Sequence, residues 1–201
     1  MNATNRDCKP LQRAEAQRGR ILDAARQCFI EHGFHAATIA NIAETAQVSA
    51  GLIYRYFENK SAIILAIVEE QLVLLREEIS LNDRPELPQL MADNYARTCG
   101  AQRGMNAALL LEISAEATRD PQIAQALDDY DAAVRQALCE WLARNRKQGG
   151  QGLPKDVAPR RALVLQCLFE GLKLRETREP GLDRGLLLAA LQEVVPGILE
   201  A

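Results

Sequence analysis

The sequence predicts an all-α protein, and three observations support this class. The 201 residues include 31 Ala and 28 Leu but only 8 Val and 6 Thr, proportions that favour helices over strands. Apolar residues recur at spacings of three and four over most of the chain, as on one face of an amphipathic helix. Glycine and proline interrupt these stretches and divide the chain into about nine helices. A globular protein of one or two domains is therefore expected.

The first three helices have clear start and stop signals. A long first helix is expected over about 12–32, with Gly33 as its stop. Thr38 is a suitable N-cap for a short second helix. The apolar face of this helix consists of Ile39, Ile42, Ala43 and Ala46. Ser49 is an N-cap for a third short helix with the sequence AGLIYRYF.

The other six helices follow from similar signals. Asn59 or Ser61 begins a fourth helix that runs to about Ser80. Five further helices are expected over about 86–101, 104–118, 121–148, 156–178 and 183–197. Pro196 is among the residues expected to break a helix. The helices form two groups, and because no low-complexity linker is present, we expect the fourth helix to join the first three helices to the last five.

Charge and composition narrow the function classes. Residues 1–60 hold 8 basic and 6 acidic side chains, whereas residues 61–201 hold 16 and 21, so the first part is compatible with a nucleic-acid partner. No apolar run reaches the roughly 18 residues of a membrane span, and no signal peptide is recognisable, so a cytoplasmic protein is expected. No HExxH, GxSxG or glycine-rich phosphate loop occurs, so an enzyme is not expected.

The cysteines indicate neither disulfides nor a metal site. They are Cys8, Cys28, Cys99, Cys139 and Cys167. Their odd number and the absence of CxxC spacing favour reduced thiols packed as small apolar residues, and no metal or other cofactor is expected. A redox sensor is the alternative, with Cys99 or Cys167 as its candidate.

Residues 38–60 predict a helix-turn-helix. Two short helices are separated by a tight turn, and the residues expected to be buried are Ile42, Ala43, Val48 and Ile53. The second of these helices is narrow enough to enter a DNA major groove, which is about 12 Å wide. Gly51 would allow a close approach of the backbone. Hydroxyl and ammonium groups suited to phosphate oxygens are supplied by Thr38, Ser49, Tyr54, Tyr56 and Lys60.

A structural interpretation of the same aromatic residues is that they pack a small three-helix core. We adopt it for Phe57, whereas Tyr54 and Tyr56 together with Lys60 exceed what packing requires in a chain with 4% aromatic residues. A helix-turn-helix used only for protein contacts or for nonspecific DNA binding is a further alternative. The small excess of basic residues at this end argues against nonspecific binding.

The stretch GFHAATIANIAETAQVSAGLIYRYFENKSAIILAI, residues 33–67, resembles the signature of the tetracycline-repressor (TetR) family of bacterial transcriptional regulators. This resemblance implies a homodimeric repressor that a small-molecule inducer releases from a palindromic double-stranded operator. It also implies a DNA-binding domain over 1–59 and a ligand-binding and dimerisation domain over 60–201. By position, Thr38, Ser49, Tyr54, Tyr56 and Lys60 would hold phosphates, and Ala50, Gly51, Leu52 and Arg55 would lie at or near base edges.

Two residues depart from the family's pattern. Gln47 stands where the turn commonly has Gly, and a left-handed backbone there would cost roughly 1–2 kcal/mol. Leu52 replaces a small hydroxyl residue, so an apolar contact, for example to a thymine methyl group, is expected instead of a polar one. The operator sequence is therefore not transferable from relatives.

Apolar helix faces in the second half are compatible with a ligand pocket or with ordinary core packing. The candidates for ligand contact are Met91, Tyr95, Cys99, Leu109, Glu112, Ile113, Glu116, Tyr130, Val134, Trp141, Cys167 and Glu170. Glu112 and Glu116 would compensate a cationic ligand, although pairing of Glu116 with Arg119 is the alternative. A hydrophobic ligand and a cationic ligand both remain open.

The last two predicted helices are unusually apolar and indicate a partner surface. By resemblance they would form a four-helix interface between two copies of the chain. In such a dimer the recognition helices must lie about 34–36 Å apart, and a ligand that changes this spacing would release the DNA. A constitutive or redox-controlled regulator without a small-molecule inducer is the alternative.

Overall fold

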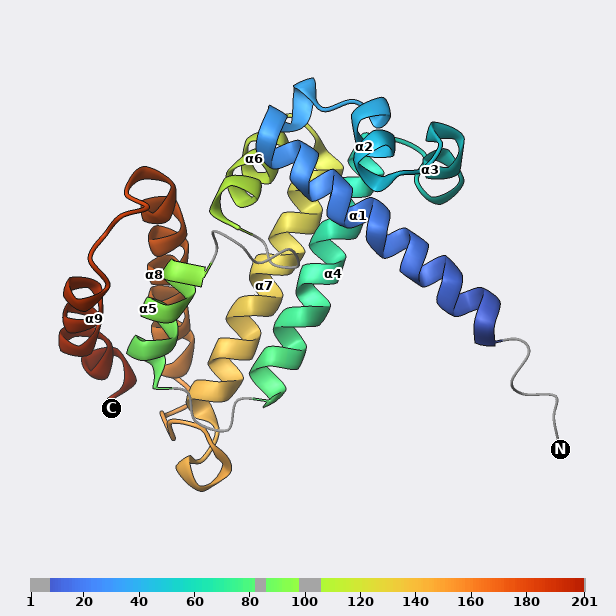
Figure 1. The fold of residues 1–201 in the computed structure, drawn as a ribbon. Helices are drawn as coiled ribbons and strands as arrows, with labels where there is room; N and C mark the ends of the chain where they lie inside the picture. The colour runs from blue at the N-terminus through green and yellow to red at the C-terminus, as the bar shows by residue number, and fades with distance from the viewer. Residues whose placement is uncertain (1–7, 82–85, 98–105, 201) are drawn as a thin grey trace, which may run out of the picture.

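The computed structural model describes the backbone of residues 8–81, 86–97 and 106–200 (Figure 1). These residues form helices and no strand, which confirms the predicted fold class. The helices are α1 (Cys8–Ala36), α2 (Ile39–Ala46), α3 (Ala50–Tyr56), α4 (Lys60–Leu81), α5 (Leu87–Arg97), α6 (Ala107–Ala117), α7 (Pro121–Ala143), the 3₁₀ turn η1 (Arg146–Gln148), α8 (Ala158–Arg178) and α9 (Arg184–Leu199).

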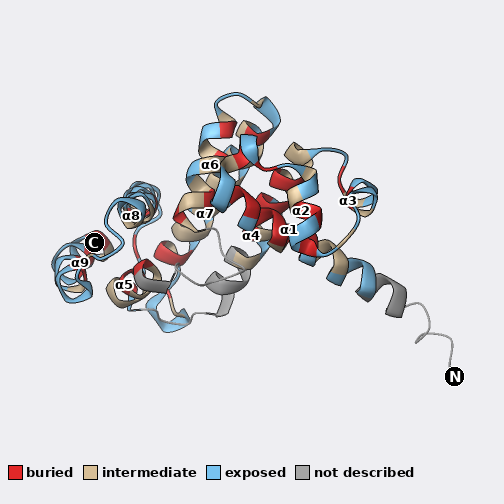
Figure 2. Ribbon diagram, turned by 45° about the horizontal axis from the view of Figure 1, so that its top comes forward, coloured by how far each residue is buried: buried red, intermediate tan, exposed pale blue. Residues whose placement is uncertain are grey.

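The helices form two groups around a central pair. In Figure 1, α2 and α3 lie beside α1 at one end, whereas α5, α8 and α9 lie on the opposite side. α4 and α7 run side by side between the groups, and α6 contacts both α1 and α7. One buried core is formed by α1, α2, α3 and α4 together with parts of α6 and α7, as the red segments of Figure 2 show. A second core joins α5, α7, α8 and α9.

Most helix boundaries follow the sequence signals, with three differences. α1 begins at Cys8, earlier than expected, and Gly33 (φ 76°, ψ 159°) interrupts it as predicted before one last turn. The helix expected over 121–148 ends at Ala143 instead, because Arg144 has an extended backbone (φ −61°, ψ 141°). Pro196 does not break α9, since Val195 and Ile198 on either side of it are buried in the second core.

Two points complete the comparison of the described helices with the sequence. None of them is long and apolar enough to cross a membrane. The expected boundaries near 101 and 104 lie outside the described residues.

Candidate functional site

Local caps build the turn between α2 and α3. Thr38 Oγ1 accepts a hydrogen bond from Asn41 N–H (3.1 Å), and Asn41 Oδ1 accepts one from Thr38 N–H (3.0 Å). This capping box begins α2. Gln47 ends α2 in the left-handed conformation (φ 56°, ψ 48°), and Ser49 Oγ accepts from Leu52 N–H (3.2 Å) to begin α3. Both predicted N-caps are confirmed.

α3 has one buried side and one exposed side. Ile53 is fully buried, and Phe57 at the end of the helix is buried as expected. The exposed side carries Ala50, Gly51, Tyr54 and Arg55, and Leu52 and Tyr56 lie half-buried at its edges. A Cβ atom added to Gly51 would meet nothing within 4 Å. No other part of the described protein covers this side of α3, so it is accessible to a partner.

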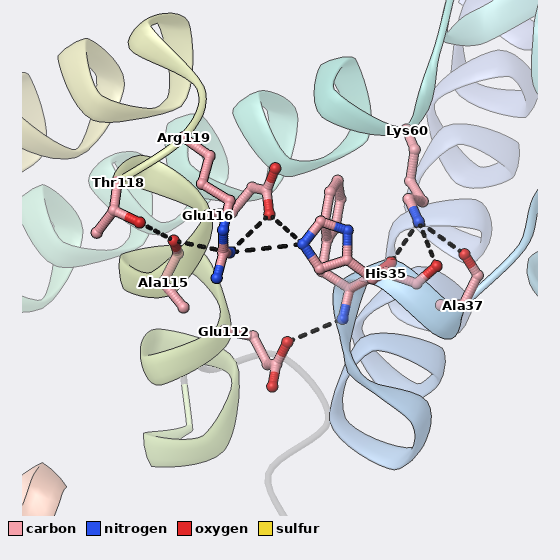
Figure 3. A network of polar contacts seen from close by, with 9 residues as sticks. His35, Ala37, Lys60, Glu112, Ala115, Glu116, Thr118 and Arg119 are labelled. Atoms are coloured by element: carbon pink, nitrogen blue, oxygen red, sulfur yellow. Dashed lines mark hydrogen bonds and ion pairs between the residues drawn. The ribbon is translucent and has the colours of Figure 1, made fainter.

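Lys60 lies apart from this exposed side. Its ammonium donates to the carbonyl oxygens of Phe34, Ala37 (2.9 Å) and His35 (3.3 Å), and lies 4.3 Å from the centre of the Phe34 ring (Figure 3). Burial lowers the pKa of Lys60, and the nearby Glu116 carboxylate opposes this effect. The ammonium thus caps the end of α1, and a phosphate would have to compete with three carbonyl groups for it.

Two carboxylates of α6 bind the same end of α1. Glu112 Oε2 accepts a hydrogen bond from Phe34 N–H (2.8 Å), and Glu116 Oε2 lies 3.1 Å from His35 Nε2 (Figure 3). We call this set of residues, Phe34, His35, Lys60, Glu112 and Glu116, the α1–α6 junction. The left-handed backbone of Gly33 frees Phe34 N–H for this contact, and a Cβ on Gly33 would lie 3.4 Å from a Glu112 oxygen.

The junction corrects one expectation about these two carboxylates. Glu112 and Glu116 do not line the cavity described below, because they lie one turn apart on the side of α6 that faces α1. The alternative pairing is present as well, since Arg119 Nη1 lies 3.5 Å from Glu116 Oε2. Sequence spacing places both residues on one face but does not say what that face contacts.

A cavity of about 520 Å³ lies between α5, α6, α7 and α8. Four predicted ligand residues line it, namely Tyr130, Val134, Trp141 and Glu170. The remaining lining residues are Leu87, Leu90, Asn94, Ala107, Leu110, Leu111, Ser114, Leu127, Asp131, Ala137, Leu138, Gln166, Phe169, Lys173 and Leu174. The volume is in the range of pockets for small molecules.

The other predicted ligand residues lie elsewhere. Met91, Tyr95, Leu109 and Ile113 are buried in the two cores, which matches the core-packing alternative. The Tyr95 hydroxyl donates to Glu179 O (2.7 Å), and burial, followed by the Glu179 carboxylate, raises the Tyr95 pKa. Cys167 is exposed and does not line the cavity. Cys99 lies outside the described residues.

Sequence reasoning found Glu170 but missed other polar residues of the cavity, above all Asp131 and Lys173. Asp131 stands three residues before Val134 on α7, so the helical spacing of the predicted face contains the signal that would have found it. Burial and the neighbouring Glu170 raise the pKa of Asp131, whereas Arg135 opposes them. Lys173 Nζ lies 3.5 Å from Glu176 Oε2. No group of His, Cys, Asp or Glu in the described ranges is placed to hold a metal ion.

The arrangement of α2, turn and α3 is a helix-turn-helix, the motif with which many transcriptional regulators enter the DNA major groove. Comparison with known proteins identifies the family. Residues 21–67 match the model of bacterial regulatory proteins of the tetR family, and residues 84–200 match that of the C-terminal domain of BetI-type transcriptional repressors. The chain belongs to the tetR family of bacterial regulatory proteins.

Individual relatives agree with this family. The HTH-type transcriptional regulator UidR of Escherichia coli K12 is 30% identical over 193 residues, which cover 94% of this chain and 95% of UidR. Salmonella enterica GusR has a similar fold (TM-score 0.71, 26% identity, 92% of this chain and 96% of GusR). A transcriptional regulator from Saccharomonospora viridis, solved in complex with choline, shares the fold alone (TM-score 0.71, 23% identity, 91% and 96%). The chain is thus a DNA-binding transcriptional regulator and not an enzyme.

Proposed function

We propose that this regulator is a cytoplasmic repressor that binds a palindromic operator as a homodimer and is released when a small molecule fills the cavity. The position of α6 carries this proposal. Ala107, Leu110, Leu111 and Ser114 on one side of α6 line the cavity. Glu112 and Glu116 on the other side hold the end of α1. A ligand that displaces α6 therefore acts directly on the helix that supports the helix-turn-helix.

The DNA contacts in this proposal come from the exposed side of α3 and from the two caps. Ala50, Gly51, Leu52 and Arg55 lie at or near base edges, and Thr38, Ser49, Tyr54 and Tyr56 contact phosphates. The hydroxyl groups of the caps lie beside free backbone N–H groups at helix N-termini, which favour anions. Lys60 acts mainly by fixing α1 against α4, and any phosphate contact it makes is secondary.

Exposed apolar side chains on α8 and α9 support a homodimer. Leu163 and Val164 on α8 and Leu186 and Val194 on α9 are each about half exposed or more, between 47% and 62%. Large apolar side chains gathered on two neighbouring helices indicate an interface. Pairing these two helices with those of a second copy sets the distance between the two α3 helices.

The cavity favours a small-molecule inducer over the constitutive or redox-controlled alternative. Among the described cysteines, Cys28 is buried, Cys139 is half-buried and Cys167 is exposed, and none is in a disulfide. By contrast, an apolar cavity with a few polar groups is the usual form of a ligand site. The choline held by the Saccharomonospora viridis regulator shows that a protein of this fold accommodates a small molecule.

Selection of genomic DNA fragments by the purified full chain at physiological salt tests the DNA-binding part. We expect one palindromic sequence, bound about 10³-fold or more tightly than random DNA. Binding that depends on salt but not on sequence would contradict the proposal.

Two substitutions to aspartate in the exposed apolar surface of α9 test the dimer. Leu186→Asp combined with Val194→Asp should yield a monomer in analytical ultracentrifugation. Operator affinity should fall by about tenfold or more, since each monomer then binds its half-site without a partner. Val73→Asp is the matched control, because Val73 is equally exposed (53%) but lies on α4. A dimer that survives the double change would show that the interface lies elsewhere.

A further inference from the structure

The cavity has an apolar closed end and a charged open end. Asp131 and Trp141 are ten residues apart on α7, which corresponds to about 15 Å along the helix. The Trp141 end is closed, since this side chain is 6% exposed and its neighbour Leu142 is fully buried. Toward the other end Glu170, on α8, is exposed to solvent, and the wall continues one turn further to Leu127 on α7 and Leu174 on α8. The cavity therefore suits an elongated molecule with one polar end.

The charge of the open end is negative. Asp131 and Glu170 are the carboxylates on the described wall, and Lys173 is its basic residue. The Lys173 ammonium is already 3.5 Å from the Glu176 carboxylate. Arg135, next to Asp131, donates through Nε to Gln166 Oε1 (2.9 Å). Burial raises the pKa of Asp131, the Glu170 and Asp128 carboxylates add to this effect, and Arg135 opposes it.

Two aromatic residues line the same cavity as the carboxylates. Tyr130 directly precedes Asp131, Phe169 directly precedes Glu170, and all four residues line the cavity. Ring faces attract organic cations, and carboxylates repel anionic ligands. The same open end gives no comparable partner to a carboxylate or phosphate ligand, because Lys173 is paired.

We infer that the cavity binds an amphiphilic organic cation, an ammonium group with an apolar tail, whose charge lies at Asp131 and Glu170 and whose tail extends toward Trp141. This inference rests on the proposed function, in which the same cavity holds the inducer. The carboxylates that compensate the charge of the ligand are thus Asp131 and Glu170, and not Glu112 and Glu116 as the sequence suggested.

Trp141 makes the inference directly testable, because it is the single tryptophan of the chain. Its fluorescence is measured while the full-length protein is titrated with octyltrimethylammonium, 1-octanol or octanoate, which share a tail and differ in charge. We expect saturable changes with the cation, at a Kd about tenfold or more below those of the alcohol and the anion. Tighter binding of octanoate, or no saturable change with any of the three, overturns the inference.

Charge-removing variants locate the cation. Asp131→Asn and Glu170→Gln should each weaken octyltrimethylammonium binding by about tenfold and leave octanol binding within about twofold. Asp129→Asn is the matched control, because Asp129 is an exposed residue of the same helix that does not line the cavity. Circular dichroism confirms the fold of each variant. Unchanged cation binding in the Asp131→Asn, Glu170→Gln double variant overturns the inference.

Operator release, followed by fluorescence anisotropy of labelled DNA, separates this inference from the proposed function. If the cation binds with the expected dependence on Asp131 and Glu170 but leaves the DNA bound, the ligand class is supported and the role as inducer fails. If octanoate releases the operator and Lys173→Met abolishes that effect, the role of the cavity is supported and the cationic ligand is excluded.

Discussion

Gln47 is, among the described residues, the non-glycine residue with a left-handed backbone (φ 56°). The turn after it is held to the end of α2, because the N–H groups of Gln47 and Val48 bond to Glu44 O (3.0 Å) and Ala43 O (2.9 Å). The turn is therefore held by hydrogen bonds at the expense of local strain, which glycine would avoid.

We predict that Gln47→Gly stabilises the protein by about 0.5–1 kcal/mol, since the relief of strain exceeds the entropy that glycine adds to the unfolded chain. For a chain of this length the thermal midpoint should rise by about 1–4 °C. Thermal denaturation followed by circular dichroism measures the change. Gln136→Gly, within α7, is the control and should have the opposite sign. A lower midpoint for Gln47→Gly would mean that the turn does not strain this residue.

Gly51 separates a structural role from a DNA-binding role at a single position. Its backbone is not left-handed, and an added Cβ would meet no atom within 4 Å. Nothing in the described protein therefore requires glycine at this helical position, where alanine is favoured by up to about 1 kcal/mol.

We predict that Gly51→Ala leaves stability unchanged or raises it slightly, yet weakens operator binding by about tenfold, because the methyl group stands where the DNA approaches. Operator affinity and the thermal midpoint are measured on the same preparation. Gly181→Ala, which also places a methyl group in open space, is the control and should leave DNA binding unchanged. Full operator affinity in Gly51→Ala would show that the exposed side of α3 does not contact the operator.

At the scale of elements, the start of α7 connects the cavity wall to the first core. Asp120 Oδ1 accepts hydrogen bonds from Gln122 N–H (2.9 Å) and Ile123 N–H (3.4 Å), and Pro121 occupies the first turn. The N–H of Gln122, followed by the Ser61 hydroxyl on α4 and Ile123 N–H, lowers the pKa of Asp120 below its usual 3.8, against a smaller opposing effect of burial.

This cap predicts a pH-dependent contribution to stability. Because the folded-state pKa is lowered, the stabilisation is present above the unfolded-state value of 3.8 and is lost as the pH falls through the lower folded-state value. At neutral pH, Asp120→Asn should therefore melt below the wild type, and the difference should shrink as the pH falls below 3.8. Thermal midpoints between pH 7 and pH 3 measure it. A difference independent of pH would show that the carboxylate charge does not stabilise the cap.

At the scale of the whole molecule, local signals were predictable and contacts between distant segments were not. The caps Thr38 and Ser49 and the break at Gly33 depend on a few neighbouring residues, so the sequence contains the information. Glu112 contacts Phe34, 78 residues away, and no periodicity indicates such a partner. Asp131 was missed for a related reason, since one helix face is compatible with both a core and a cavity until α8 is placed against it.

In the proposed function, α6 couples the cavity to the end of α1 that supports the helix-turn-helix. Glu112→Ala removes the hydrogen bond to Phe34 N–H but no wall of the cavity, so ligand binding and coupling should separate. We expect the Kd of the ligand, read from Trp141 fluorescence, to stay within about threefold. The difference in operator affinity between the ligand-free and ligand-bound protein should shrink about tenfold, because a coupling of 1–3 kcal/mol has lost one of its contacts. Glu140→Ala, at an exposed position of α7 outside the cavity, should change neither quantity. An unchanged operator response in Glu112→Ala would mean that the ligand acts on the helix-turn-helix through α4 and α7 rather than through the α1–α6 junction.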